Sequence, residues 1–198
     1  ELAKQCSMSP DALDKEAGRH GEPKRARAFL GIFRPIFEEY EAENAREGKI
    51  DFADMVSSAC REIERGACAT RYRYILIDEF QDISLARKSL VQAIRQQVTG
   101  CRVFAVGDDW QSIYRFTGSD LAITTEFSKY FGACKRAHLT RTFRFGPKLG
   151  AVSETFVQEN KKQIPKKLVC RDGGGDPPVT VEFDPPDNAL ESILKEIG

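Results

Sequence analysis

The sequence lacks the features that mark membrane-spanning, exported and zinc-binding proteins. No apolar run approaches the roughly 18 residues that span a bilayer, and the opening ELAKQCSMSP has no signal-peptide plan. None of the six cysteines forms a CxxC pair, and only two histidines could complete a zinc site. We therefore expect a cytoplasmic protein with reduced thiols that serve as small core residues, such as Cys101 in GCRVFAV.

The chain also lacks a phosphate-binding loop of the form GxxxxGK[ST]. Its only Gly-Lys pair, Gly48-Lys49, is followed by Ile50, and Glu43 stands where the first glycine of such a loop would be. The first residue is Glu1 instead of methionine. We expect the chain to be an internal piece of a longer protein.

Charge is balanced overall but uneven along the sequence. The net charge is zero, with 30 basic and 30 acidic residues. Residues 135–171 contain ten Lys and Arg against two Glu, whereas residues 172–198 contain seven acids against one Lys. The basic stretch is suited to phosphate groups of a nucleotide or a nucleic acid, although a solvated face balanced by its neighbours is the plain alternative.

Helical patterns fill the first third of the chain. Apolar residues recur at helical spacing over 24–47, where Pro35 is expected to kink or divide the helix. A second helix is predicted after Asp51 as N-cap, with Gly66 as its terminator. The residues expected on its buried face are Phe52, Met55, Val56 and Ala59.

The middle of the chain alternates between strand and helix patterns. The predicted order is strand 74–78, helix 86–98, strand 101–108, helix 119–131 and strand 137–143. Continuously apolar strands separated by helices indicate a parallel sheet buried on both faces, and therefore an α/β fold. Beyond it, 171–187 is predicted to be a loop with one short strand, and 188–198 an amphipathic helix.

Acidic residues follow the first two predicted strands. Asp78 and Glu79 come directly after YILI, and Asp108 and Asp109 follow VFAVG. Ligands of open parallel sheets bind beyond the carboxyl ends of the strands, and Mg²⁺ prefers a few carboxylates together with water and phosphate. Asp78 would hold the ion and Glu79 would activate a water molecule. Two alternatives are an acidic pair that caps the sheet edge, and a two-metal nuclease or polymerase site made by all four acids.

Three long motifs support the interpretation of Asp78 and Glu79 as a magnesium and water-activating site. RYILIDEFQDIS, VFAVGDDWQSIYRFTGSD and LTRTFRF resemble, in order and spacing, motifs II, III and IV of the UvrD/Rep-type superfamily 1 DNA helicases. The small residue after GDDWQSIYRF and the segment AITTEF are most similar to the DNA helicase IV branch. In that branch a small residue such as Thr117 stands where many relatives have arginine, and Phe116 replaces the more common tryptophan.

The resemblance implies further site residues. Gln111 matches the glutamine that contacts the γ-phosphate, and Arg144 the arginine that reaches it from the second motor domain. Phe143 matches an aromatic that stacks on adenine. Tyr114 and Phe116 match rings that lie along single-stranded DNA, for which core packing is the alternative.

The resemblance also implies an organisation. Residues 1–48 would end an inserted helical subdomain, 49–138 would form the second half of a first RecA-like motor domain, and 139–198 would begin a second one. The implied fold is α/β: a partial RecA-like parallel sheet flanked by helices, with an N-terminal helical segment.

The implied function belongs to the longer protein. It is an ATP-dependent DNA helicase that uses ATP and Mg²⁺ to translocate on single-stranded or partly duplex DNA, 3′ to 5′, in DNA repair or recombination. The piece alone is expected to be inactive, and its uncovered sheet edges and apolar faces to favour self-association. The alternative is a degenerate helicase-like module that acts as a non-catalytic DNA or protein adaptor.

Overall fold

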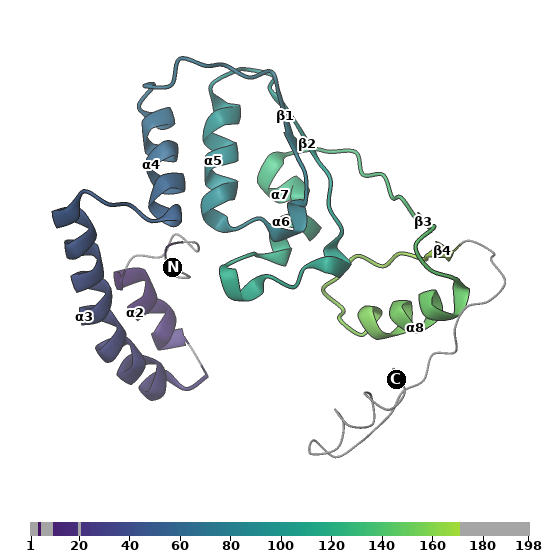
Figure 1. Cartoon of the computed structure of the whole chain (residues 1–198), viewed down its shortest axis with the longest axis horizontal. Helices are drawn as coiled ribbons and strands as arrows, with labels where there is room; N and C mark the ends of the chain where they lie inside the picture. Colours follow the sequence, from purple (N-terminus) through teal and green to yellow (C-terminus); the bar gives the residue numbers. More distant parts are fainter. Residues whose placement is uncertain (1–3, 5–9, 20, 171–198) are drawn as a thin grey trace, which may run out of the picture. The chain divides into compact units, whose positions relative to one another are not determined.

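The computed structural model of the chain describes residue 4 and residues 10–19 and 21–170 (Figure 1). They form two compact units. The first contains the described residues up to Lys135 together with Lys162–Ile164, and the second contains Arg136–Lys161 and the described residues from Pro165 on. The division into helicase subdomains stays a prediction, because compactness alone does not identify a motor domain. The strand and helix predicted within 171–198 lie outside the described residues.

Two helices open the first unit. Helix α2 (Pro10–Arg19) packs along α3 (Pro23–Glu47), as Figure 1 shows. Helix α3 starts with proline in its first turn, where no backbone N–H is needed, and ends at Gly48, which has a left-handed φ of 63°. Of the two effects expected of Pro35, a division of the helix is wrong, since α3 continues through it, and a kink stays a prediction. One missing backbone hydrogen bond does not outweigh those of a 25-residue helix.

The third helix, α4 (Phe52–Glu64), begins as predicted. Asp51 accepts the Asp54 N–H and the Asp54 side chain accepts the Asp51 N–H, which makes a capping box. The predicted buried face is wrong. Phe52 and Met55 are exposed, and Ala53 is the buried residue of this helix, which packs against α5 (Leu85–Gln96).

A parallel strand pair forms the centre of the first unit. β1 (Tyr74–Ile77) pairs with β2 (Arg102–Ala105), and Tyr74 lies opposite Arg102 in the register. The predicted strands and their parallel pairing are confirmed. The single helix expected over 119–131 is two short helices, α6 (Leu121–Thr125) and α7 (Phe127–Phe131), which are separated at Glu126.

One face of this sheet covers the core of the unit. The core consists of Phe80, Ile83, Ile123 and Phe131, and Ile77, Val103 and Ala105 of the strands pack against it. Phe80 also makes an edge contact with Phe127, with ring centroids 5.4 Å apart.

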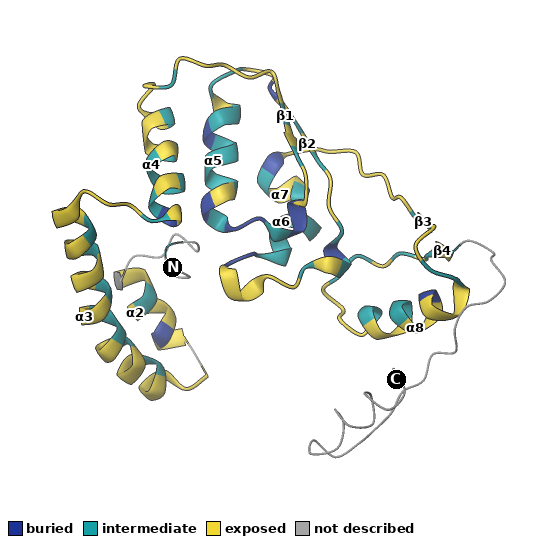
Figure 2. Ribbon diagram, viewed as in Figure 1, coloured by how far each residue is buried: buried dark blue, intermediate teal, exposed yellow. Residues whose placement is uncertain are grey.

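The opposite face of the sheet is bare. Tyr74, Leu76 and Phe104 are between 63% and 75% exposed, and Figure 2 shows the exposed positions along both strands. The expectation that the strands are buried on both faces is therefore wrong for the part of the chain that the structure describes.

The described part of the second unit contains a smaller sheet and one helix. β3 (Arg141–Thr142) pairs in parallel with β4 (Val169–Cys170), so the strand predicted over 137–143 is reduced to two residues. Helix α8 (Pro147–Gln158) packs against β4 at Gly150, where an added Cβ would lie 2.3 Å from the Cys170 Sγ. The α/β class is confirmed by both units.

The cysteines differ in how far they are buried. Cys101 is buried as expected, but Cys134 is exposed, so the thiols are not all core residues. Within the described ranges, no helix is both long and apolar enough to cross a membrane.

Candidate functional site

The carboxyl ends of β1 and β2 meet at one edge of the sheet. The Val106 N–H donates to the Ile77 carbonyl, and the Phe80 N–H donates to the Val106 carbonyl, both at 2.8 Å. The chain therefore stays paired just beyond both strands. Asp78 and Glu79 follow β1 at this edge and are exposed, and the Asp78 Oδ1 accepts the Glu79 N–H at 2.9 Å.

Glu79 has an uncommon backbone conformation. Its φ of 49° and ψ of 42° are left-handed, and no other described residue except glycine has a positive φ. Such a conformation costs an L-residue about 1–2 kcal/mol and is enriched at functional sites. The short helix η1 (Phe80–Asp82) starts directly after Glu79 and turns the chain back under the sheet edge.

Gln81 lies behind Glu79 in the interior. It is 3% exposed, its Nε2 donates to the Glu79 Oε2 at 2.7 Å, and its Oε1 accepts the Asp108 N–H at 3.0 Å. Gly107 passes close to it, since an added Cβ would lie 2.7 Å from the Gln81 Oε1. The sequence gives no signal of this burial, because Gln81 stands in the polar motif DEFQD.

The loop after β2 carries Gln111. The Asp108 carboxylate accepts the Trp110 N–H at 3.2 Å through Oδ1 and the Gln111 Nε2 at 2.8 Å through Oδ2. These bonds hold the short helix η2 (Asp109–Gln111) and leave Gln111 exposed beside Asp108. Hydrogen bonds thus link Glu79 with Gln111 through two intervening residues, the side chain of Gln81 and both the backbone N–H and the carboxylate of Asp108.

Asp109 does not join this group. It is 4% exposed, and its Oδ2 accepts the Ile164 N–H at 2.7 Å. Its carbonyl accepts the Gln163 Nε2, and the Trp110 Nε1 donates to the Ile164 carbonyl. The expectation that Asp109 adds its carboxylate to the strand-end acids is wrong, because it binds the segment Lys162–Ile164 instead.

Asp82 has a different environment from the exposed acids. Burial raises its pKa, the charge of Glu79 raises it further, and Arg87 opposes the shift. Its Oδ1 is buried without a hydrogen-bond partner among the described residues. Asp82 therefore adds to the acidic character of the motif without belonging to the exposed edge.

Tyr114 and Phe116 are surface residues of the first unit. Tyr114 directly precedes the short helix η3 (Arg115–Thr117), and Phe116 lies within it. The two side chains are 45% and 73% exposed, and their ring centroids are 6.0 Å apart with a tilt of 48°. Core packing is therefore not their role within the described chain. Ile113 is exposed beside them, a feature that the sequence analysis missed.

Phe143 and Arg144 belong to the second unit, directly after β3. Both are exposed, and the Arg144 N–H donates to the Thr142 Oγ1 at 3.4 Å. Asp78, Glu79 and Gln111 belong to the other unit, and the nucleotide-binding roles of Phe143 and Arg144 stay predictions.

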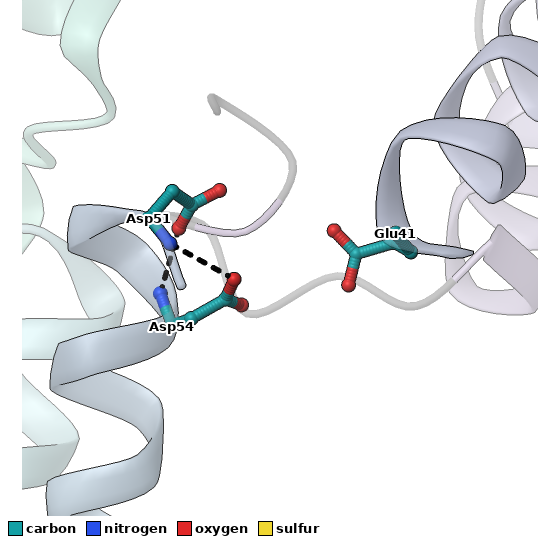
Figure 3. Close-up of side chains that lie close together, drawn as sticks. All are labelled: Glu41, Asp51 and Asp54. Atoms are coloured by element: carbon teal, nitrogen blue, oxygen red, sulfur yellow. Dashed lines mark hydrogen bonds between the residues drawn. The ribbon is translucent and has the colours of Figure 1, made fainter. Parts of the chain in front are cut away.

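A second acidic cluster lies between α3 and α4. Figure 3 shows Glu41, Asp51 and Asp54 with their carboxylates turned toward one another. The Lys4 Nζ donates to Asp51 and Asp54 at 2.9 Å and pairs with Glu41. Burial alone would lower the pKa of Lys4, but these carboxylates raise it above its usual range. An ammonium group thus already contacts all three carboxylates and offsets part of their negative charge.

A comparison with protein families identifies the family of the chain. The model of the UvrD/REP helicase N-terminal domain matches residues 1–132. The chain belongs to the UvrD/REP helicase family. The resemblance stated from motifs II, III and IV is confirmed.

Similarity to individual helicases agrees with this family assignment. The chain is similar to DNA helicase IV of Escherichia coli strain K12, with 37% identity over 169 residues that cover 85% of this chain and 24% of that protein. It is also similar to the ATP-dependent DNA helicase PcrA of Staphylococcus epidermidis strain RP62A, with 26% identity over 167 residues that cover 82% of this chain and 23% of that protein. The chain thus spans about a quarter of the length of these curated relatives.

The strand-end acids of this UvrD/REP chain have the chemistry that Mg²⁺ requires. Asp78 presents an exposed carboxylate at the sheet edge, and hard oxygen donors with access for water and phosphate suit this ion. A two-metal nuclease site is not favoured, because Asp109 is bound elsewhere. Within the described ranges, Glu41, Asp51 and Asp54 form the one group of three possible metal ligands, and it does not include the strand-end acids.

Proposed function

We propose that this chain is the part of an ATP-dependent DNA helicase that carries the acidic residues of its ATP hydrolysis site. The observation that carries the proposal is the edge beyond β1 and β2, where exposed Asp78 and Glu79 are linked to Gln111 through hydrogen bonds. Family membership supports the reaction class, since the relative PcrA is named an ATP-dependent DNA helicase.

Each residue at the edge has a proposed role. Asp78 would hold Mg²⁺, which when bound neutralises phosphate charge during hydrolysis. Glu79 would orient and deprotonate the attacking water. Gln111 would contact the γ-phosphate, since an amide can donate to phosphate and accept from water.

Four further residues are proposed on their match to the family motifs. Arg144 would contribute positive charge to the transferred phosphate, and Phe143 would stack on adenine. Tyr114 and Phe116 would stack on bases of single-stranded DNA, and their exposure is consistent with that role. Translocation from 3′ to 5′ in DNA repair, in the cytoplasm, is part of the proposal.

The bare sheet face supports a RecA-like arrangement in the longer protein. Parallel sheets are normally covered on both faces, and burying a large apolar side chain contributes about 1.5–3 kcal/mol. Tyr74, Leu76 and Phe104 would then lie under further elements of the motor domain. We propose that residues 49–138 belong to the first motor domain, after a helical subdomain that ends near residue 48, and that residues 139–198 begin the second motor domain.

The test is DNA-stimulated ATP hydrolysis by the full-length protein that contains this chain. Glu79→Gln should lower kcat by about 10²- to 10⁴-fold, because the amide cannot accept a proton from water. Glu62→Gln is the matched control, since Glu62 is an exposed partner of Arg65 in a surface ion pair. The 198-residue chain alone should show no turnover.

Three results would count against the proposal. Turnover by the chain alone that Glu79→Gln abolishes would show that the piece is complete in itself. Equal activity of the Glu79→Gln and Glu62→Gln proteins would exclude Glu79 as the base. DNA binding by the full-length protein without any ATP hydrolysis would favour the adaptor alternative.

A further inference from the structure

Gln81 uses both ends of a buried amide. Its Nε2 donates to the Glu79 Oε2 at 2.7 Å, and its Oε1 accepts the Asp108 N–H at 3.0 Å. The orientation of the amide is therefore fixed. A reversed amide would place oxygen against carboxylate and NH₂ against N–H, and both contacts would be repulsive.

The surroundings also hold Gln81 in place. The Ser112 Oγ donates to the Gln81 carbonyl at 3.3 Å. The loop after β2 therefore forms hydrogen bonds with both the backbone and the side chain of Gln81. Gly107 leaves no room on the other side, since an added Cβ would lie 2.7 Å from the Gln81 Oε1 and 3.0 Å from its backbone nitrogen. A residue so enclosed cannot move without moving the loop.

A chain of hydrogen bonds passes through this amide. It runs from the Glu79 carboxylate to Gln81, from Gln81 to the Asp108 N–H, and from the Asp108 carboxylate to the Gln111 Nε2. Asp108 contacts Gln81 through its backbone N–H and Gln111 through its carboxylate. A displacement of Gln111 is therefore transmitted to the backbone of Asp108.

We propose that Gln81 is a positioning residue that fixes the Glu79 carboxylate relative to the loop that carries Gln111. This inference rests on the proposed function, in which Glu79 activates water and Gln111 contacts phosphate. In this scheme Gln81 itself contacts neither the water nor the phosphate. Its bond holds one oxygen of the exposed Glu79 carboxylate. Through Asp108, the position of that carboxylate then depends on the position of Gln111.

Two substitutions separate the two hydrogen bonds. Gln81→Glu keeps the size and the acceptor for the Asp108 N–H, but replaces the donor to Glu79 with a second carboxylate. Gln81→Met keeps a similar length and loses both bonds. Gln92→Met is the matched control, because the partly buried Gln92 donates from Nε2 to the Tyr130 carbonyl in the same unit, away from Glu79 and Asp108.

The measurements use the full-length protein, with active sites counted by binding of a non-hydrolysable ATP analogue. Both Gln81 variants should lower kcat per active site by about 10- to 100-fold, with the KM for ATP changed less than about threefold. Hydrogen exchange of the segment 107–112 should accelerate in Gln81→Met and stay slow in Gln81→Glu. Gln92→Met should match the wild type in both measurements.

The outcomes distinguish this inference from the proposed function. If Glu79→Gln leaves ATP hydrolysis intact, the proposed function fails. If Glu79→Gln abolishes hydrolysis but both Gln81 variants keep wild-type kcat per active site, the positioning role alone is overturned. A purely structural role is also recognisable, since it would lower the number of active sites and leave kcat per site unchanged. Should Gln81→Met not fold, Gln81→Glu still decides, because it keeps the volume of the side chain.

Discussion

At the scale of single residues, the loop after β2 depends on one glycine for space. A Cβ at Gly107 would lie 2.7 Å from the Gln81 Oε1 and 3.0 Å from the backbone nitrogens of Phe80 and Gln81. Two of these three neighbours are backbone atoms that cannot rotate away. Gly107 therefore allows the two strand ends to approach closely enough for Gln81 to connect them.

Gly107→Ala should destabilise the protein by about 1–3 kcal/mol, since overpacking forces the backbone of the loop or of η1 to shift. Urea unfolding measures this change. Gly31→Ala is the control, because Gly31 lies inside α3 with no atom within 4 Å of an added Cβ. That variant should be as stable as the wild type or more stable by up to about 1 kcal/mol. Equal stability of the two variants would contradict the close approach.

The sequence revealed the chemistry of the site residues better than their surroundings. Asp78, Glu79 and Gln111 could be predicted because they stand in long motifs after apolar strands. The burial of Asp109 could not be predicted, because its partner Ile164 lies 55 residues further along the chain. Adjacent acids in a sequence thus need not face the same ligand.

At the scale of elements, predictions from local sequence signals, such as helix caps, agreed with the structure. Predictions of which face an element buries did not. The cap of α4 was predictable because Asp51 and Asp54 satisfy backbone groups of their own turn. The face that α4 buries depends on which elements pack against it, and in this structure Ala53 is buried whereas Phe52 is exposed. Likewise, an apolar strand does not reveal whether one face or both are covered.

The start of α4 also belongs to a cluster that joins three parts of the first unit. Lys4 donates to Asp51 and Asp54, and the Tyr40 hydroxyl donates to Asp51 at 3.0 Å. Burial alone would raise the pKa of Asp51, but the Asp54 N–H, Lys4 and Tyr40 together lower it from 3.8 to about 2. The charged form of Asp51 is thus favoured by folding.

Asp51→Asn tests this cluster, because asparagine keeps the N-cap and removes the charge. A lowered folded-state pKa stabilises the protein above the unfolded pKa, and this stabilisation is lost as the pH falls through about 2. The variant should be less stable by about 1 kcal/mol at pH 7, after allowance for solvent screening, and the difference should shrink as the pH approaches 2. Asp11→Asn, at an exposed position on α2, should change little. A deficit that stays constant across this pH range would contradict the ionic role of Asp51.

At the scale of the whole molecule, the chain forms two compact units that carry different predicted site residues. The first contains Asp78, Glu79 and Gln111, and the second contains Phe143 and Arg144. The α/β class could be predicted because alternating strand and helix patterns are visible in the sequence. Long-range contacts could not be predicted: Lys4 reaches Asp51, and no local pattern encodes such a pairing.

The most direct test of the account is metal binding at the strand edge. In the full-length protein with a non-hydrolysable ATP analogue, Mn²⁺ can replace Mg²⁺ and be counted by electron paramagnetic resonance. Asp78→Asn keeps the acceptor for the Glu79 N–H. Asp120→Asn is the control, because the Asp120 carboxylate likewise accepts a local N–H, that of Ala122.

We expect the wild type and Asp120→Asn to bind one Mn²⁺ per bound nucleotide, and Asp78→Asn to bind it at least about tenfold more weakly. Mn²⁺ affinity in Asp78→Asn equal to that of the wild type would contradict the assignment of this edge as the metal and nucleotide site.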